Sequence, residues 1–209
     1  MPDSFKDFYQ LFPVSRETGE KLQIYADLLT KWQKSQNLVS VATLDHLWMR
    51  HFADSAQIME HGRDKGCWVD LGSGAGFPGL VLAMMGDGRA NHHVHLVESN
   101  QGKCAFLGEV IRKTDAPASI YPVRVEDIGN KLPKGIKTIT ARAFAPLDRL
   151  CSYILPLWEE GCLAILPKGR NLSEELAAAS PLWQLDYDVI PSKTDPQASL
   201  LRIRSLKKR

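Results

Sequence analysis

The sequence predicts an α/β protein built on a doubly wound, Rossmann-like sheet and preceded by a helical extension. Short apolar segments alternate with longer amphipathic ones from about residue 66 onward, which is the pattern of repeated strand–helix units. A glycine-rich loop follows the first apolar segment directly, and the residues before it show no strong strand signal. We therefore expect an N-terminal helical extension over residues 1–62 and a sheet domain over residues 63–209.

Two helical stretches are expected in the extension, over residues 17–33 and roughly 44–60. In the first, apolar side chains recur at spacings of three and four and draw one stripe along a helix; they are Leu22, Tyr25, Leu28, Leu29 and Trp32.

The sheet domain is expected to hold five strands interleaved with helices, then two closing strands. Strands that alternate with helices form a parallel sheet with right-handed crossovers. The last two strands lie close together in the sequence around a proline-containing loop, which predicts a terminal hairpin with one antiparallel strand. The expected strands cover residues 67–71, 93–99, 119–125, 136–143, 161–169, 183–190 and 199–205. One expected helix begins near residue 76, a second spans 102–113, and a third spans 145–158 with a break at Pro156.

Composition limits the class of protein. The net charge of +2 is too small to indicate nucleic-acid binding, although residues 202–209 hold five basic residues and no acidic one. That segment is either a solvated tail or a contact for a polyanion. The four cysteines form no CxxC pair, which fits neither a zinc site nor a disulfide framework and indicates reduced thiols in a cytoplasmic protein. We see no signal peptide and no apolar run near the roughly 18 residues of a membrane span, so we expect no membrane partner. The lack of a zinc-site cysteine pattern leads us to expect no bound metal.

The glycine-rich loop, GSGAGFPG, indicates a site where the backbone lies close to a nucleotide-like ligand. Gly74 to Gly79 form a literal G-x-G-x-x-G, and Glu98 lies 19 residues past Gly79, as in dinucleotide-binding proteins. Asp70 argues against a dinucleotide, because a carboxylate at the strand end repels a pyrophosphate but suits an ammonium group. The glycines also begin at Gly72, which puts Phe77 at the third glycine position of the fingerprint.

S-adenosylmethionine combines an ammonium group with a ribose and an adenine and carries no phosphate, so we predict it as the cofactor. Gly72 and Gly74 would lie against it, and Asp70 would meet the ammonium group, although Asp70 could instead cap the following helix. Glu98 is the expected ribose partner, unless it is a solvated acid at the strand end. Val125 and Glu126 follow the third strand and are placed to meet the adenine, unless they belong to an ordinary loop.

The segment after the fourth strand indicates the methyl acceptor. Thr140 to Pro146 hold no cysteine nucleophile for a pyrimidine and no Asn/Asp-Pro-Pro-aromatic loop for an exocyclic amine. An acceptor with a free lone pair, such as ring nitrogen 7 of guanine, needs no general base, and none is expected here. Arg142 could bind the cofactor carboxylate, the guanine edge or a phosphate, or could form a surface salt bridge.

Basic and aromatic residues elsewhere are candidates for contacts with RNA. Arg50 and His51 lie in RHFADS, and Lys168 follows the fifth strand. Such residues suit an RNA backbone and unstacked bases. His51, with Asp54 one helical turn away, could equally be a hydrogen-bonded structural residue, and Trp32 suits core packing.

Taken together, these motifs resemble the ribosomal RNA small subunit methyltransferase G family, also called GidB-like. The resemblance rests on KWQKSQNLVSV, RHFADS, VDLGSGAGFPGL, RVED, ARAFAPL and LPKGR. It implies a class I methyltransferase sheet and S-adenosylmethionine-dependent synthesis of 7-methylguanosine in 16S rRNA, at position 527 of the 530 loop. It also implies cofactor contacts at Gly72, Phe77, Val125, Glu126 and Arg142. The family usually has a second basic residue where this chain has Cys104.

The predicted protein is thus a cytoplasmic, monomeric enzyme whose partner is 16S rRNA or the small ribosomal subunit. Two alternatives are a NAD-dependent oxidoreductase, which would bind NADH, and a non-catalytic RNA-binding module on the same fold.

Overall fold

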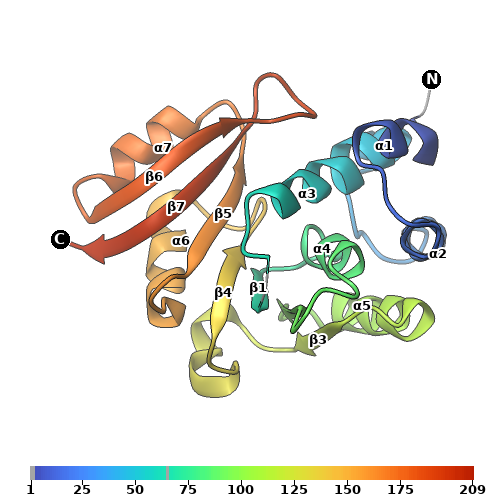
Figure 1. Cartoon of the computed structure of the whole chain (residues 1–209), viewed down its shortest axis with the longest axis horizontal. Coiled ribbons are helices and arrows are strands. Elements are labelled where there is room, and N and C mark those ends of the chain that lie inside the picture. Colours follow the sequence, from blue (N-terminus) through green and yellow to red (C-terminus); the bar gives the residue numbers. More distant parts are fainter. Residues whose placement is uncertain (1–2, 65) are drawn as a thin grey trace.

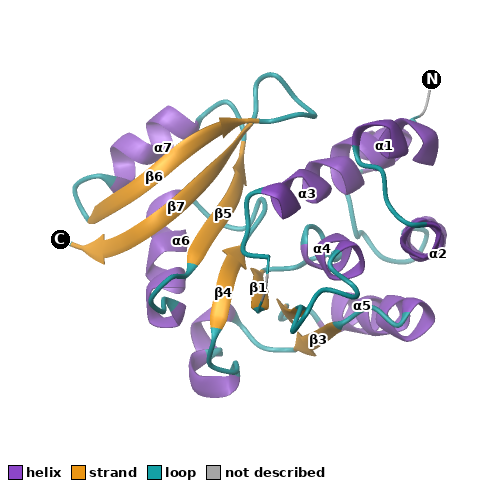
Figure 2. Ribbon diagram, viewed as in Figure 1, coloured by secondary structure: helices purple, strands orange, loops and turns teal. Residues whose placement is uncertain are grey.

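A seven-stranded sheet forms the centre of the protein (Figures 1 and 2). The computed structural model describes residues 3–64 and 66–209. The strand order is β3-β2-β1-β4-β5-β7-β6, and β7 runs antiparallel to the other six strands, so the sheet has one antiparallel strand as the sequence predicts. The strands are β1 (Cys67–Leu71), β2 (His93–Val97), β3 (Ala118–Tyr121), β4 (Ile136–Thr140), β5 (Leu163–Lys168), β6 (Trp183–Pro191) and β7 (Ser199–Lys208).

Helices cover both faces of the sheet, which explains why the central strands read as apolar runs. Trp68 and Val69 of β1 are fully buried and point into cores on opposite faces. One core contains residues of α4 (Gly79–Met85), α5 (Gln101–Thr114) and the N-terminal helices. The other contains residues of α6 (Leu147–Ile154) and α7 (Leu172–Ala179).

The N-terminal segment consists of helices joined by loops, and its second half is irregular. The expected helix over 17–33 is α2 (Arg16–Trp32), whose N-cap residue Ser15 accepts a hydrogen bond from the backbone N–H of Thr18 at 3.2 Å. The expected stretch near 44–60 is a chain of short 3₁₀, π and α turns. The remaining elements are α1 (Phe5–Leu11), η1 (Val41–His46), η2 (Trp48–Ala53), α3 (Asp54–Ala56) and η3 (Gln57–Glu60). This segment shares one core with the sheet, so the division at residue 62 stays a prediction.

Several element boundaries differ from the sequence expectation. Strand β3 stops at Tyr121, before Pro122, which has no N–H to donate to a strand pairing. Strand β4 stops at Thr140, and Ala143 lies in the left-handed region with φ of 51°. Helix α4 begins at Gly79, after the loop residues that the sequence assigned to it. Helix α7 was not predicted from the sequence.

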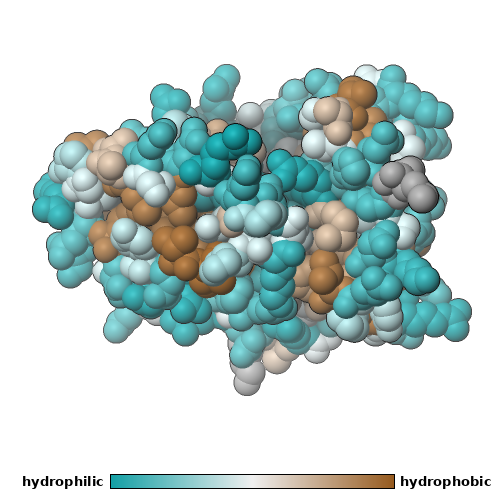
Figure 3. All heavy atoms as spheres, turned by 90° about the horizontal axis from the view of Figure 1, so that it is seen from above, coloured by the Kyte–Doolittle hydropathy of each residue, from teal (hydrophilic) through white to brown (hydrophobic). Residues whose placement is uncertain are grey.

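The basic segment 202–209 is neither a free tail nor an isolated basic patch, because most of it is strand β7. Arg202 donates to Asp188 of β6 at 2.6 Å, and Arg204 donates to Asp186 at 2.7 Å and also to Asp188. The face seen in Figure 3 is mostly hydrophilic, with separate hydrophobic patches, the largest on the side of the C-terminal hairpin.

Neither a membrane-spanning helix nor a metal centre is evident in the described residues. No helix within 3–64 or 66–209 has the length and apolar character to cross a membrane. The same residues contain no group of three or more His, Cys, Asp or Glu side chains that could hold a metal ion. All four cysteines are free thiols.

Candidate functional site

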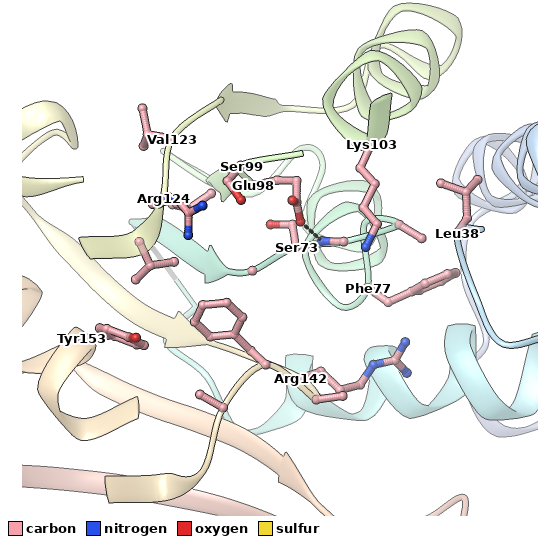
Figure 4. Close-up of a pocket in the computed structure, with 18 of the residues that line it drawn as sticks. Leu38, Ser73, Phe77, Glu98, Ser99, Lys103, Val123, Arg124, Arg142 and Tyr153 are labelled. Atoms are coloured by element: carbon pink, nitrogen blue, oxygen red, sulfur yellow. Dashed lines mark hydrogen bonds between the residues drawn. The ribbon is translucent and has the colours of Figure 1, made fainter. Parts of the chain in front are cut away.

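A cavity of about 540 Å³ opens where the parallel strands end (Figure 4). In an open α/β sheet, ligands bind beyond the carboxyl ends of the strands, where the connecting loops diverge. The walls come from the loops after β1, β2, β3 and β4. The cavity brings together seven of the eight residues predicted to contact the cofactor, namely Gly72, Gly74, Phe77, Glu98, Val125, Glu126 and Arg142.

The glycine loop forms one wall and has no room for a side chain at its first position. Gly72 has φ of 68°, and a Cβ atom there would lie 2.2 Å from Cδ2 of Phe144. The N–H groups of Gly72 and Ser73 donate to the carbonyl of Val97 at 2.9 and 3.0 Å, which ties the loop to the end of β2. At Gly72 and Gly74 the loop therefore presents bare backbone to the cavity.

Glu98 is held in place by backbone donors. Its Oε2 accepts from the N–H of Gly74 at 2.9 Å, drawn as a dashed line in Figure 4, and its Oε1 accepts from the N–H of Asn100 at 2.7 Å. Carboxylate oxygens have several lone pairs, so both atoms can still accept from a ligand hydroxyl. Such a fixed carboxylate at the end of the second strand suits a ribose diol.

Asp70 departs from its predicted role, because it lies beneath the loop and does not line the cavity. Its Oδ2 accepts from the N–H of Gly79 at 3.1 Å and its Oδ1 accepts from the hydroxyl of Thr140 at 3.0 Å. Burial raises the pKa of this carboxyl to about 6. The structure thus shows the alternative role, in which Asp70 holds the start of α4.

Arg142 joins the cavity to the N-terminal RHFADS motif. Its Nη1 donates to Oδ2 of Asp54 and to the carbonyl of Arg50, each at 3.1 Å, and its Nη2 donates to Nδ1 of His51 at 2.8 Å. The guanidinium also lies 5.2 Å from the ring centroid of Phe77. Burial and the nearby positive charge of Arg142 lower the pKa of His51 to about 3, so its ring is neutral.

A second cavity of about 390 Å³ lies beside the first and shares His51, Arg142 and Ala143 with it. It brings together the three predicted substrate-contact candidates, Arg50, His51 and Lys168. Three ion pairs line it: Arg50 with Asp195 at 2.9 Å, Lys168 with Glu175 at 2.6 Å, and Arg142 with Asp54 at 3.1 Å.

The N-terminal segment also supports the glycine loop directly. The hydroxyl of Tyr25, on α2, donates to the carbonyl of Ala75 at 2.5 Å. The ring of Tyr25 stacks on that of Phe77 with centroids 5.1 Å apart. The helical extension therefore helps to set the shape of the cavity.

Some residues of the first cavity were not found by sequence reasoning. Lys103 reaches toward it from α5 and Tyr153 from α6 (Figure 4), and Leu38 and Arg149 line it as well. The hydroxyl of Tyr153 donates to Oε1 of Glu126 at 2.7 Å, and this hydrogen bond lowers the pKa of Glu126. None of these residues belongs to a motif with its own chemical signature, so only the folded arrangement reveals them.

These features fit S-adenosylmethionine: a bare loop at Gly72, the carboxylate of Glu98 for ribose hydroxyls, Val125 for an adenine, and Arg142 for a carboxylate. Fold and site together define an S-adenosylmethionine-dependent methyltransferase. The chain belongs to the rRNA small subunit methyltransferase G family, whose family model matches residues 18–200.

Known proteins of this family are similar over most of the chain. The ribosomal RNA small subunit methyltransferase G of Methylorubrum populi is 47% identical over 194 residues, covering 92% of this chain and 91% of that protein. The protein of the same name from Parvibaculum lavamentivorans is 45% identical over 205 residues, covering 96% and 89%. A SAM-dependent methyltransferase from Aquifex aeolicus shares the fold, with a TM-score of 0.56 at 12% identity, covering 83% of this chain and 96% of that one. Nothing in these comparisons supports a NAD-dependent oxidoreductase.

Proposed function

We propose that this protein transfers a methyl group from S-adenosylmethionine to ring nitrogen 7 of a guanosine in 16S rRNA, at position 527 of the 530 loop. The observation that carries the proposal is the pair of cavities that meet at Arg142 and Ala143 in a chain of this family. One cavity suits the cofactor, and the other is lined by groups that can meet an extruded base.

We assign the cofactor contacts to the loops of the first cavity. Gly72 and Gly74 approach with backbone alone, and Phe77 closes the end of the loop. Glu98 accepts from the ribose, and Val125 with Glu126 borders the adenine. Arg142 lies where it can bind a carboxylate or the acceptor base.

The transfer needs alignment more than proton movement. Bound S-adenosylmethionine supplies an electrophilic methyl group on a positively charged sulfur. The N7 lone pair forms the new N–C bond as the S–C bond breaks, so the positive charge passes from sulfur to the guanine ring and no proton is lost. Among the described residues, no cysteine lines either cavity, which argues against attack from carbon 5 of a pyrimidine. The task of the chain is therefore to hold the two reactants in line.

We further propose that the enzyme acts as a monomer in the cytoplasm, on rRNA within or on its way to the small subunit. One chain contributes residues to both cavities, and the free cysteines fit a reducing compartment.

The test uses labelled S-adenosylmethionine with unmethylated small subunits and, separately, with protein-free 16S rRNA. We expect label in 7-methylguanosine at the proposed position, located by cleavage of the RNA at that base. RNA binding without label would favour the non-catalytic alternative, and label at another base would refute the site.

A further inference from the structure

The second cavity contains a largely buried ion pair, Lys168 with Glu175, whose residues do not line the cofactor cavity. Lys168 lies at the end of β5, and its side chain is only 7% exposed. Its Nζ donates to Oε2 of Glu175 on α7 at 2.6 Å, and the N–H of Leu147 donates to the same oxygen at 3.0 Å. Both side chains line this cavity, and neither lines the cofactor cavity.

The pair retains unused hydrogen-bonding capacity. An ammonium group has three donors, and among the described residues Lys168 uses one of them, on Glu175. Both described contacts of Glu175 fall on Oε2, so Oε1 remains an acceptor. The cavity wall therefore presents a donor beside an acceptor, held by a backbone contact.

A donor beside an acceptor is complementary to the edge of guanine and not to that of adenine. Guanine presents an acceptor, O6, beside a donor, N1–H, whereas adenine presents a donor, the N6 amine, beside an acceptor, N1. In a site with a buried donor beside a buried acceptor, a base binds poorly if it leaves both groups unpaired or places donor against donor and acceptor against acceptor.

We propose that Lys168 and Glu175 recognise the target base as guanine, Lys168 through O6 and Glu175 through N1–H. The proposal rests on the function proposed above and adds the specificity determinant of the acceptor. The second cavity is large enough for a base, because its volume of about 390 Å³ lies within the usual range of small-ligand pockets, about 300–1,000 Å³. The shared wall at Arg142 and Ala143 puts a base in this cavity next to the cofactor cavity.

Glu175 also has a role in the transfer itself. As the N7–methyl bond forms, the guanine ring becomes cationic and N1–H becomes a stronger hydrogen-bond donor. A carboxylate fixed at N1–H therefore interacts more strongly with the transition state than with the neutral base, which accelerates the reaction.

The first experiment changes the RNA and leaves the protein intact. Small subunits are reconstituted with 16S rRNA that carries guanosine, inosine, 1-methylguanosine or adenosine at the target position, and transfer of labelled methyl is measured. Inosine keeps O6 and N1–H and should react within about fivefold of guanosine. 1-Methylguanosine and adenosine should react at least about 10²-fold more slowly. Equal rates for 1-methylguanosine and guanosine would overturn the proposal, whereas no 7-methylation of guanosine would overturn the function beneath it.

The second experiment changes the protein. Glu175→Gln removes the charge at N1–H and should lower kcat by about tenfold or more, with unchanged affinity for S-adenosylmethionine in calorimetry. Glu174→Gln is the matched control, because Glu174 is adjacent to Glu175 on α7, is exposed and lines neither cavity. A variant that binds the cofactor normally and keeps full kcat would refute the role of Glu175, and parallel effects in both variants would point to a general effect of charge on α7.

Discussion

Removing one hydroxyl, in Tyr25→Phe, should test whether the N-terminal helices hold the cofactor loop. Tyr25 is fully buried, and burial raises the pKa of its hydroxyl well above the ordinary value, so it remains a donor at neutral pH. The substitution keeps the ring stacking on Phe77 and leaves the buried carbonyl of Ala75 without its 2.5 Å partner. An unsatisfied buried acceptor costs about 1–3 kcal/mol in the free energy of unfolding. For a chain of 209 residues this is a drop of about 2–12 °C in Tm.

The assay is urea unfolding followed by circular dichroism, together with calorimetric titration of S-adenosylmethionine. Tyr9→Phe is the control, because Tyr9 is 46% exposed and has no hydrogen-bond partner for its hydroxyl within the described residues. We expect the Tyr25 variant to lose both stability and cofactor affinity, and the Tyr9 variant to lose neither. A change below about 0.5 kcal/mol with unaltered cofactor binding would show that the hydroxyl does not support the loop.

Three further predictions concern the same site. Gly72→Ala should weaken cofactor binding at least about tenfold in calorimetry, because the new methyl group lies within 2.2 Å of Phe144 at a positive φ. Arg142→Lys keeps the positive charge but loses the planar guanidinium that donates to both Asp54 and His51. We expect kcat to fall by about 10²-fold while circular dichroism shows an intact fold. The raised pKa of Asp70, about 6 against an ordinary 3.8, means that its contribution to stability is full below pH 4 and is lost as the pH rises through 6. Asp70→Asn should therefore remove that part of the pH dependence in urea unfolding, and an unchanged profile would show that Asp70 titrates normally.

The sequence sufficed for the sheet and for most of the cofactor cavity, because both follow from local patterns. Apolar segments indicate where the strands lie, although β3 and β4 stop earlier than expected, and a glycine loop at a strand end indicates where a ligand binds. Helix α7 has apolar residues at helical spacing, at Leu172, Leu176 and Ala179, but its eight residues are too few for that period to stand out in the sequence. Because this helix was not expected, sequence reasoning did not find Glu175, which pairs with Lys168 only in the folded chain. Asp70 had two chemically sound roles, and only burial beneath the loop distinguishes them.

The RHFADS motif shows why a segment outside the sheet still determines what happens at its edge. Residues 50, 51 and 54 are spaced to lie on one side of a helix, so a carbonyl, a ring nitrogen and a carboxylate converge there on Arg142. The backbone over Trp48–Ala53 is a π-helix, a widened turn that is frequent at functional sites. Because Arg142 and His51 line both cavities, we expect these contacts to set the relative position of cofactor and acceptor in the proposed transfer. Substitutions in the N-terminal segment should therefore change the transfer rate, even at Asp54, which does not line the cofactor cavity.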